Sequence, residues 1–162
     1  MTCNNQNESF SKISIQLAFL SPTKNMSLFE KLICTASDSR YPYVELIIDD
    51  KWLSLTNGYI RLKPIEQLDV VKYDYANLGI RNISDDVLYN TISFLNSQEG
   101  KKVSKFNKFI INFTRFNIKV KDTWFDSEIV TTVLQMLGIE ETYVLDPQFT
   151  LPGDLAKIFY ME

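Results

Sequence analysis

The residues best suited to chemistry in this 162-residue sequence lie in the run Trp124-Phe125-Asp126-Ser127-Glu128. A carboxylate or a hydroxyl in such a run could act as a nucleophile, and the indole could line a pocket. Histidine is the usual proton acceptor for that chemistry, but the sequence contains none. The composition therefore excludes Ser-His-Asp and Cys-His catalysis and any zinc site that uses histidine.

The same side chains have structural interpretations, which we prefer. Asp126 and Glu128 fall in the first turn of an expected helix, where the free amides and the helix dipole favour carboxylates. Trp124, and Trp52 earlier in the chain, are expected to fill the core rather than line a pocket. Helix capping would explain the two acids, and packing in the core would explain the two tryptophans.

The two cysteines supply neither a nucleophile nor a metal site. Cys3 lies in a polar leader and Cys34 in an apolar helical run, and two thiols are too few for a disulfide framework or a zinc cage. No histidine is present to activate Cys34. The sequence therefore predicts no cofactor and no metal, and it indicates a reducing compartment.

Signals for export or membrane insertion are not visible. Residues 1–10, MTCNNQNESF, have no basic start and no apolar stretch, and nowhere do 18 apolar residues run together. We expect a flexible polar tail over residues 1–10, no signal peptide and no transmembrane segment. The protein should be intracellular and soluble, or associated with a virion.

A basic stretch from residue 101 to 121 is the strongest charge asymmetry. It holds seven basic residues and no acid, whereas the other 141 residues carry a net charge of −10. Four phenylalanines interleave with the cations, and their spacing favours one buried helical stripe with solvated lysines behind it. A single-stranded nucleic-acid groove or an anionic-lipid surface is the alternative. The cations are Lys101, Lys102, Lys105, Lys108, Arg115, Lys119 and Lys121, and the aromatic residues are Phe106, Phe109, Phe113 and Phe116.

The elements that must position these residues fit one domain, over residues 11–162. A strand is expected at 12–20, and a helix follows a capping box formed by Ser27 and Glu30. Residues 43–73 alternate at period two, which predicts four consecutive antiparallel strands, the last at 68–73, with a type I′ turn at Asn57-Gly58. The fold class is therefore α+β, an antiparallel meander packed against helices.

Three further helices complete the expected layout. Ser84 caps one that stops at Gly100, and another runs from about Ser127 to Leu137 before Gly138. Pro152 opens the last. No internal repeat is present.

The order of these elements and several short motifs resemble the permuted papain-like enzymes of the NlpC/p60 superfamily, whose histidine precedes their cysteine. In that family a strand begins approximately small-His-hydrophobic-Glu-Leu, a hairpin with an aromatic residue follows, and Trp-Phe-Cys-Ser-Glu opens a helix. The matching stretches here are Tyr41 to Ile48, Trp52 to Gly58 with Arg61, Trp124 to Glu128, and Leu151 to Leu155.

The departures from the family fall on its catalytic positions. Asp126 stands where the resemblance places the nucleophile, and Tyr43 stands where it places the base. A carboxylate attacks amides poorly, and a tyrosine with a pKa near 10 is a poor base at neutral pH. The resemblance therefore implies a papain-like scaffold without its dyad, and a vestigial cleft formed by Tyr43, Glu45, Trp52, Trp124, Asp126 and Ser127.

The leading hypothesis is a non-catalytic pseudoenzyme that binds protein partners or serves in assembly, as a component of a large viral particle. One alternative is a hydrolase or acyltransferase with a rearranged site at Asp126, Ser127 and Tyr43. A second is an anion or nucleic-acid binder that uses residues 101–121.

Overall fold

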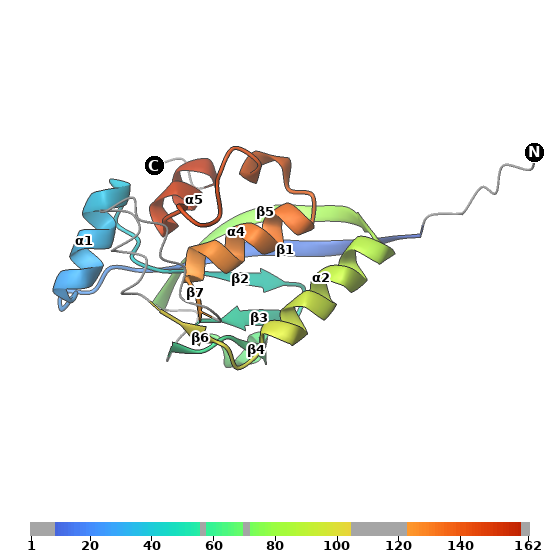
Figure 1. The fold of residues 1–162 in the computed structure, drawn as a ribbon, viewed down its shortest axis with the longest axis horizontal. Coiled ribbons are helices and arrows are strands. Elements are labelled where there is room, and N and C mark those ends of the chain that lie inside the picture. The colour runs from blue at the N-terminus through green and yellow to red at the C-terminus, as the bar shows by residue number, and fades with distance from the viewer. Residues whose placement is uncertain (1–8, 56–57, 70–71, 105–122, 160–162) are drawn as a thin grey trace, which may run out of the picture.

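A five-stranded antiparallel sheet organises the computed structural model, which describes residues 9–55, 58–69, 72–104 and 123–159 (Figure 1). Its spatial order is β4-β3-β2-β1-β5. A two-stranded parallel sheet lies beside it, formed by β6 and β7. The strands are β1 (Phe10–Leu20), β2 (Val44–Ile48), β3 (Lys51–Ser54), β4 (Arg61–Pro64), β5 (Tyr73–Ser84), β6 (Lys102–Val103) and β7 (Thr123–Trp124).

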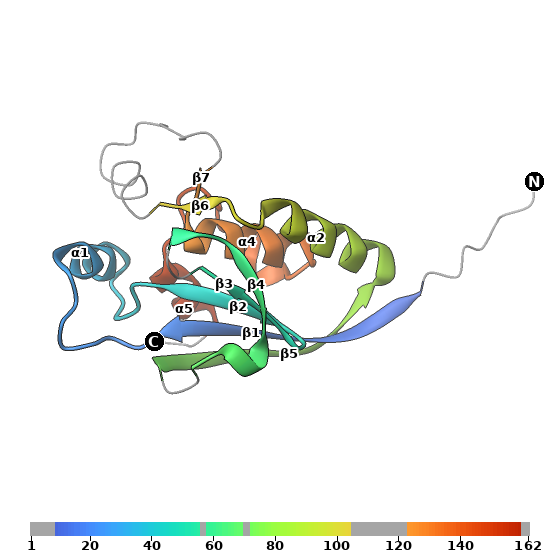
Figure 2. The ribbon, with the colours of Figure 1, turned by 90° about the horizontal axis from the view of Figure 1, so that it is seen from below.

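The described residues form four helices, of which α2, α4 and α5 contact the sheet, so the predicted α+β class is confirmed. Figure 2 shows α2 and α4 on one side of the sheet, and the turn after β4 on the other. The helices are α1 (Leu28–Ser37), α2 (Asp85–Gln98), α4 (Asp126–Met136) and α5 (Pro152–Phe159). Two short 3-10 helices, Ile65–Gln67 and Glu140–Thr142, lie in the connections.

The two faces of the sheet bury two separate cores because side chains alternate along each strand. On the helix-covered face, Leu46 of β2 packs with Ile129 and Leu134 of α4, and all three are fully buried. On the opposite face, Ile47 packs with Trp52 in a smaller cluster. Ile65 and Leu68, which follow β4, also belong to this second cluster.

The predicted strand at 68–73 is wrong. Leu68 follows a 3-10 turn, and the strand that begins at Tyr73 is a longer one, β5, which pairs with β1 rather than with β4. The sequence pattern hides β5 because it is an edge strand that carries polar residues and a bulge. Leu78 is the extra residue of that bulge, and Gly79 has a φ of 80°.

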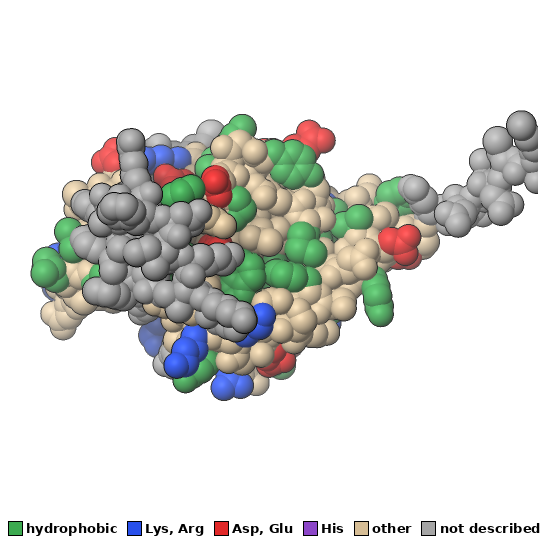
Figure 3. All heavy atoms as spheres, in the orientation of Figure 1, with side chains coloured by type: hydrophobic (Ala, Val, Ile, Leu, Met, Phe, Trp, Pro, Cys, Tyr) green, Lys and Arg blue, Asp and Glu red, His purple; other side chains and the backbone are tan. Residues whose placement is uncertain are grey.

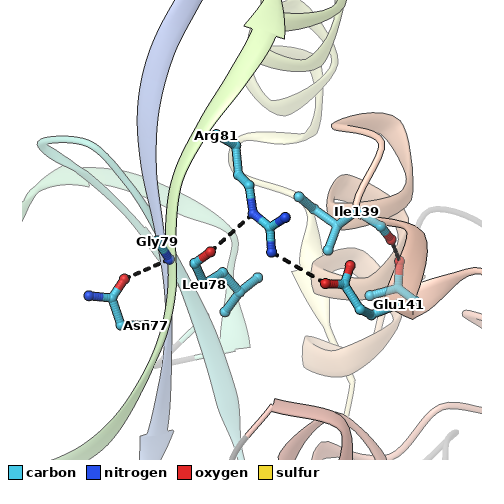
Figure 4. A network of polar contacts seen from close by, with 7 residues as sticks. Asn77, Leu78, Gly79, Arg81, Ile139 and Glu141 are labelled. Carbon is cyan, nitrogen blue, oxygen red and sulfur yellow. Dashed lines mark hydrogen bonds and ion pairs between the residues drawn. The ribbon is translucent and has the colours of Figure 1, made fainter.

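Figure 4 shows polar contacts on either side of the bulge, and among them the ion pair between Arg81 and Glu141 joins β5 to another part of the fold. The Asn77 carboxamide oxygen accepts from the Gly79 amide at 2.8 Å. Arg81 donates from Nε to the Leu78 carbonyl at 3.0 Å and forms a 3.3 Å ion pair with Glu141, which follows α4. The bulge therefore places Arg81 where it can bridge the sheet edge and the loop after α4.

The other predicted elements are found close to their expected limits. The strand expected at 12–20 is β1, and the Ser27 capping box opens α1. Ser84 caps α2, and Gly138, with a φ of 76°, follows α4. Of the expected type I′ turn only Gly58 is described, since Asn57 lies outside the described residues.

Helix α5 begins at Pro152, as predicted, and docks on the C-terminal end of α1. Lys157 donates to the Ser37 carbonyl at 2.7 Å, which satisfies an acceptor that the helix leaves unbonded. Gly153 faces the same helix end so closely that an added Cβ would lie 2.5 Å from the Ser37 hydroxyl. The glycine is required there for close approach.

Candidate functional site

Asp126 lies at the start of α4 and reaches the start of β2. Its Oδ2 atom accepts a 3.2 Å hydrogen bond from the Val44 amide. The capping role falls instead to Glu128, whose Oε2 accepts from the Phe125 amide at 3.3 Å. The two acids therefore differ, although both were expected to cap: Glu128 closes the helix end, and Asp126 ties the helix to the central sheet.

Tyr43 precedes β2, next to the residue that Asp126 contacts. It is half-buried, and burial is the largest cause that raises its pKa. A hydrogen bond with the Glu30 side chain and the negative charges of Glu30 and Asp126 raise that pKa further. Tyr43 therefore keeps its proton at neutral pH, and the positions of base and nucleophile implied by the resemblance lie close together in the fold.

Helix α1 contributes two residues to this region that sequence reasoning missed. Glu30 was assigned only to the capping box, and Cys34 only to an apolar run, yet the Glu30 side chain is hydrogen-bonded to Tyr43 and Cys34 lies near it. They are four residues apart, so they lie on one face of the helix. Their spacing was the only feature of the sequence that indicated a shared position. We define Tyr43, Asp126, Glu30 and Cys34 as the acidic site.

Ser127 and Trp124, which were expected in the vestigial cleft, make structural contacts. Ser127 is fully buried, and its hydroxyl donates to the Thr150 carbonyl at 2.7 Å. The Trp124 ring packs edge-on against Phe94 at 5.9 Å, and its Nε1 donates to Gln98 at 3.0 Å. Ser127 thus holds the segment before α5, and Trp124 holds β7 to α2.

Glu45 and Trp52 lie on the opposite face of the sheet. The Glu45 carboxylate, 2% exposed, accepts from Trp52 Nε1 at 2.7 Å and from the Leu55 amide at 2.8 Å. Burial raises its pKa, against the lowering effect of the hydrogen bonds from Leu55, Tyr73 and Trp52. Glu45 and Trp52 therefore bond to each other, whereas Ser127 and Trp124 bond to other partners. The negative charge of Asp126 also raises the pKa of Glu45.

Only the first two cations of the predicted basic stretch can be placed. Lys101 is half-buried and Lys102 exposed, at the start of β6. The expected helical stripe lies outside the described residues, together with its cations. The residues of the basic stretch that lie outside the described ranges are Lys105, Lys108, Arg115, Lys119, Lys121, Phe106, Phe109, Phe113 and Phe116.

The arrangement offers no metal cage, because within the described ranges no three acidic or cysteine side chains come together in a way that could hold an ion. No helix in the described parts of the chain has the length and apolar character needed to cross a bilayer. Comparisons with protein-family models, with curated proteins and with solved structures gave no match.

Proposed function

We propose that this chain is a non-catalytic protein built on a scaffold of the cysteine peptidase or amidase type, and that it acts by binding partners in an assembly. The observation that carries the proposal is the contact between α4 and β2. Asp126 accepts the Val44 amide at 3.2 Å, beside a Tyr43 hydroxyl that is hydrogen-bonded to Glu30. These are the two positions to which the family resemblance assigns nucleophile and base.

Neither side chain suits acyl transfer in this setting. The Asp126 carboxylate keeps the negative charge of a thiolate at the helix N-terminus but lacks its nucleophilicity. Tyr43 holds its proton because burial and two carboxylates raise its pKa. With no histidine in the chain, the site has no group that could accept a proton and return it near pH 7.

Asp126, Tyr43 and Glu30 are better suited to a structural role. Asp126 joins α4 to the strand at the centre of the sheet, while Glu30 and Tyr43 join α1 to the same point. We propose that the former catalytic position now fixes helix against sheet, and that the surface around it serves protein partners. A component of a viral particle is the setting we favour.

The first experiment assays peptide, amide and ester substrates with the purified full chain and with Asp126→Ala. We expect no turnover by either protein. Turnover that is lost on Asp126→Ala would overturn the proposal in favour of a hydrolase or acyltransferase centred on Asp126, with Tyr43 and Ser127 beside it.

A second experiment tests the scaffold. In a background of Cys3→Ser and Cys34→Ser, the variants Asp126→Cys and Asp126→Cys/Tyr43→His are alkylated with iodoacetamide as a function of pH. We expect the introduced thiol to have a pKa below the ordinary value of about 8.5, and lower still with the imidazole present.

The matched control for the alkylation is Ser93→Cys, at an exposed position in the middle of α2. Its thiol should titrate near the ordinary value. If all three thiols behave alike, the α4 terminus does not stabilise a thiolate, and the relationship to a cysteine-hydrolase scaffold fails even if the protein is inactive.

A further inference from the structure

The β4 edge of the sheet gathers cations from two distant parts of the chain. Residues before β4 pair with those before β6: the Ile60 amide donates to the Lys101 carbonyl at 3.0 Å, and Tyr59 forms an antiparallel bridge with Lys102. Arg61 and Lys63 follow along β4. We call Tyr59, Arg61, Lys63 and Lys102 the basic strip.

The side chains of the strip face away from the main core. Leu62 packs against that core, so its neighbours Arg61 and Lys63 point to the other face. The Lys63 ammonium lies 5.0 Å from the centroid of the Trp52 ring, which belongs to the second face of the sheet. In Figure 3, basic side chains gather along the margin where Figure 1 places β4 and β6.

The cations of the strip form no ion pair with another described residue, although the Lys63 ammonium lies over the Trp52 ring. The ion pairs found in the described part of the chain involve Arg40, Lys72 and Arg81 but none of the three cations of the strip. Arg61 and Lys102 are exposed, and Lys63 is half-buried. The exposed Arg61 and Lys102, which pair with no described acid, therefore place positive charge on this sheet edge.

We propose that the basic strip binds single-stranded nucleic acid. Arg61 and Lys63 recur on one face about 7 Å apart, since strands rise about 3.3 Å per residue, and this spacing suits successive phosphates of an extended strand. Tyr59, 41% exposed, is paired with Lys102 and offers a ring on which a base can stack. Proteins that bind single-stranded nucleic acid combine cations with exposed aromatic rings in this way.

A membrane surface fits the strip less well. Anchoring in lipid needs exposed apolar side chains beside the cations. The large ones that the described residues expose lie on other elements, and they include Phe10, Leu28, Ile80, Val144 and Phe149. The strip itself presents Tyr59 as its large exposed ring. This inference is independent of the proposed pseudoenzyme role, since its residues do not belong to the acidic site.

The test measures binding of the full chain to a fluorescein-labelled oligo(dT) of about 20 nucleotides by anisotropy, between about 50 and 200 mM salt. The triple variant Arg61→Gln/Lys63→Gln/Lys102→Gln should weaken binding at least about tenfold at the lower salt. It should also make the slope of log affinity against log salt shallower by about 2, for three lost phosphate contacts.

Two further variants address the stacking and the local charge. Tyr59→Ala should weaken binding by about fivefold or more while leaving the salt slope unchanged. Glu99 is an exposed acid next to Gly100, whose amide donates to the Ile60 carbonyl within the strip region, and Glu99→Gln should tighten binding. The matched control is Lys12→Gln/Lys24→Gln/Lys31→Gln, which removes the same charge from exposed positions elsewhere and should bind like the parent.

Circular dichroism and thermal unfolding establish that each variant is folded before its affinity is compared. Failure of the parent to bind the oligonucleotide at the lower salt overturns the inference. So does an equal loss in the strip variant and in the control, which would indicate attraction without a site. Vesicles of phosphatidylcholine and phosphatidylserine form the second arm, and binding to vesicles without binding to the oligonucleotide also overturns it.

Discussion

The indole of Trp52 and the carboxylate of Glu45 meet across neighbouring strands, joined by a 2.7 Å hydrogen bond from Nε1 to Oε2 on the face of the sheet away from α2 and α4. The other carboxylate oxygen accepts from the Leu55 amide. A carboxylate that is 2% exposed is costly unless donors surround it, so these bonds make the site tolerable.

Removing the indole donor should be destabilising. Trp52→Phe leaves Glu45 Oε2 without that donor in a buried position, which costs about 1–3 kcal/mol beyond the loss of ring contacts. Urea unfolding gives the free energy of unfolding. Tyr89→Phe, at a ring that is 74% exposed, is the control and should change it by less than about 0.5 kcal/mol. Equal effects of the two changes would refute the role given to the indole.

Glu45 should also make stability depend on pH with a sign opposite to that of most carboxylates. Because burial raises its pKa in the folded state, the protonated form is favoured by folding. Its contribution is therefore fully present below the ordinary pKa of glutamate and is lost as pH rises through the folded value.

The measurement is the difference in unfolding free energy between the parent and Glu45→Gln, from pH 4 upward. As pH rises, the parent should lose stability relative to Glu45→Gln. The variant Glu66→Gln, at an exposed position, should show no such trend. A trend in the parent's favour would mean that the hydrogen bonds from Leu55, Tyr73 and Trp52 outweigh burial, and that the pKa is lowered.

Gly153→Ala should destabilise the protein, although alanine normally stabilises a helix. The added Cβ would lie 2.5 Å from the Ser37 hydroxyl and from the Ser39 Cβ, so α5 would have to move away from α1. Overpacking of this kind costs about 1–3 kcal/mol, whereas a compatible Gly-to-Ala change gains about 0.4–1 kcal/mol. A lower melting temperature of Gly153→Ala would indicate overpacking, and a higher one would indicate a compatible substitution.

Ser127→Ala separates a structural serine from a reactive one. The hydroxyl donates to the Thr150 carbonyl within a fully buried position, so its removal should lower the free energy of unfolding by about 1–3 kcal/mol. Thr132→Ala is the control, because that hydroxyl bonds to the carbonyl of its own helix, from Glu128. A Ser127→Ala protein as stable as the parent would contradict this assignment.

Local patterns predicted those parts of the fold that local physics determines. The Ser27 capping box, the alternation of β2 and the stop of α4 at Gly138 each depend on a few neighbouring residues. Strand β5 escaped prediction because its pairing with β1 is long-range, and because a bulge at Leu78 breaks its alternation.

The candidate site shows the same division. The closeness of Tyr43 and Asp126 was expected from the resemblance. The spacing of Glu30 and Cys34 indicated only that they share a face of α1, and not that this face meets Tyr43. Glu45 was expected in the same cleft as Tyr43, but its carboxylate accepts hydrogen bonds from the Trp52 indole and the Leu55 amide instead.

The position of β1 between β2 and β5 has a consequence for synthesis on the ribosome. Phe10 pairs with Ser84, so one edge of the first strand stays open until more than seventy further residues have been made. At about 5–20 residues per second, this interval lasts roughly 4–15 s. During it the apolar strand KISIQLAFL exposes backbone groups that any other extended chain could occupy. Nascent chains of this protein should therefore depend on holdase chaperones until β5 has emerged.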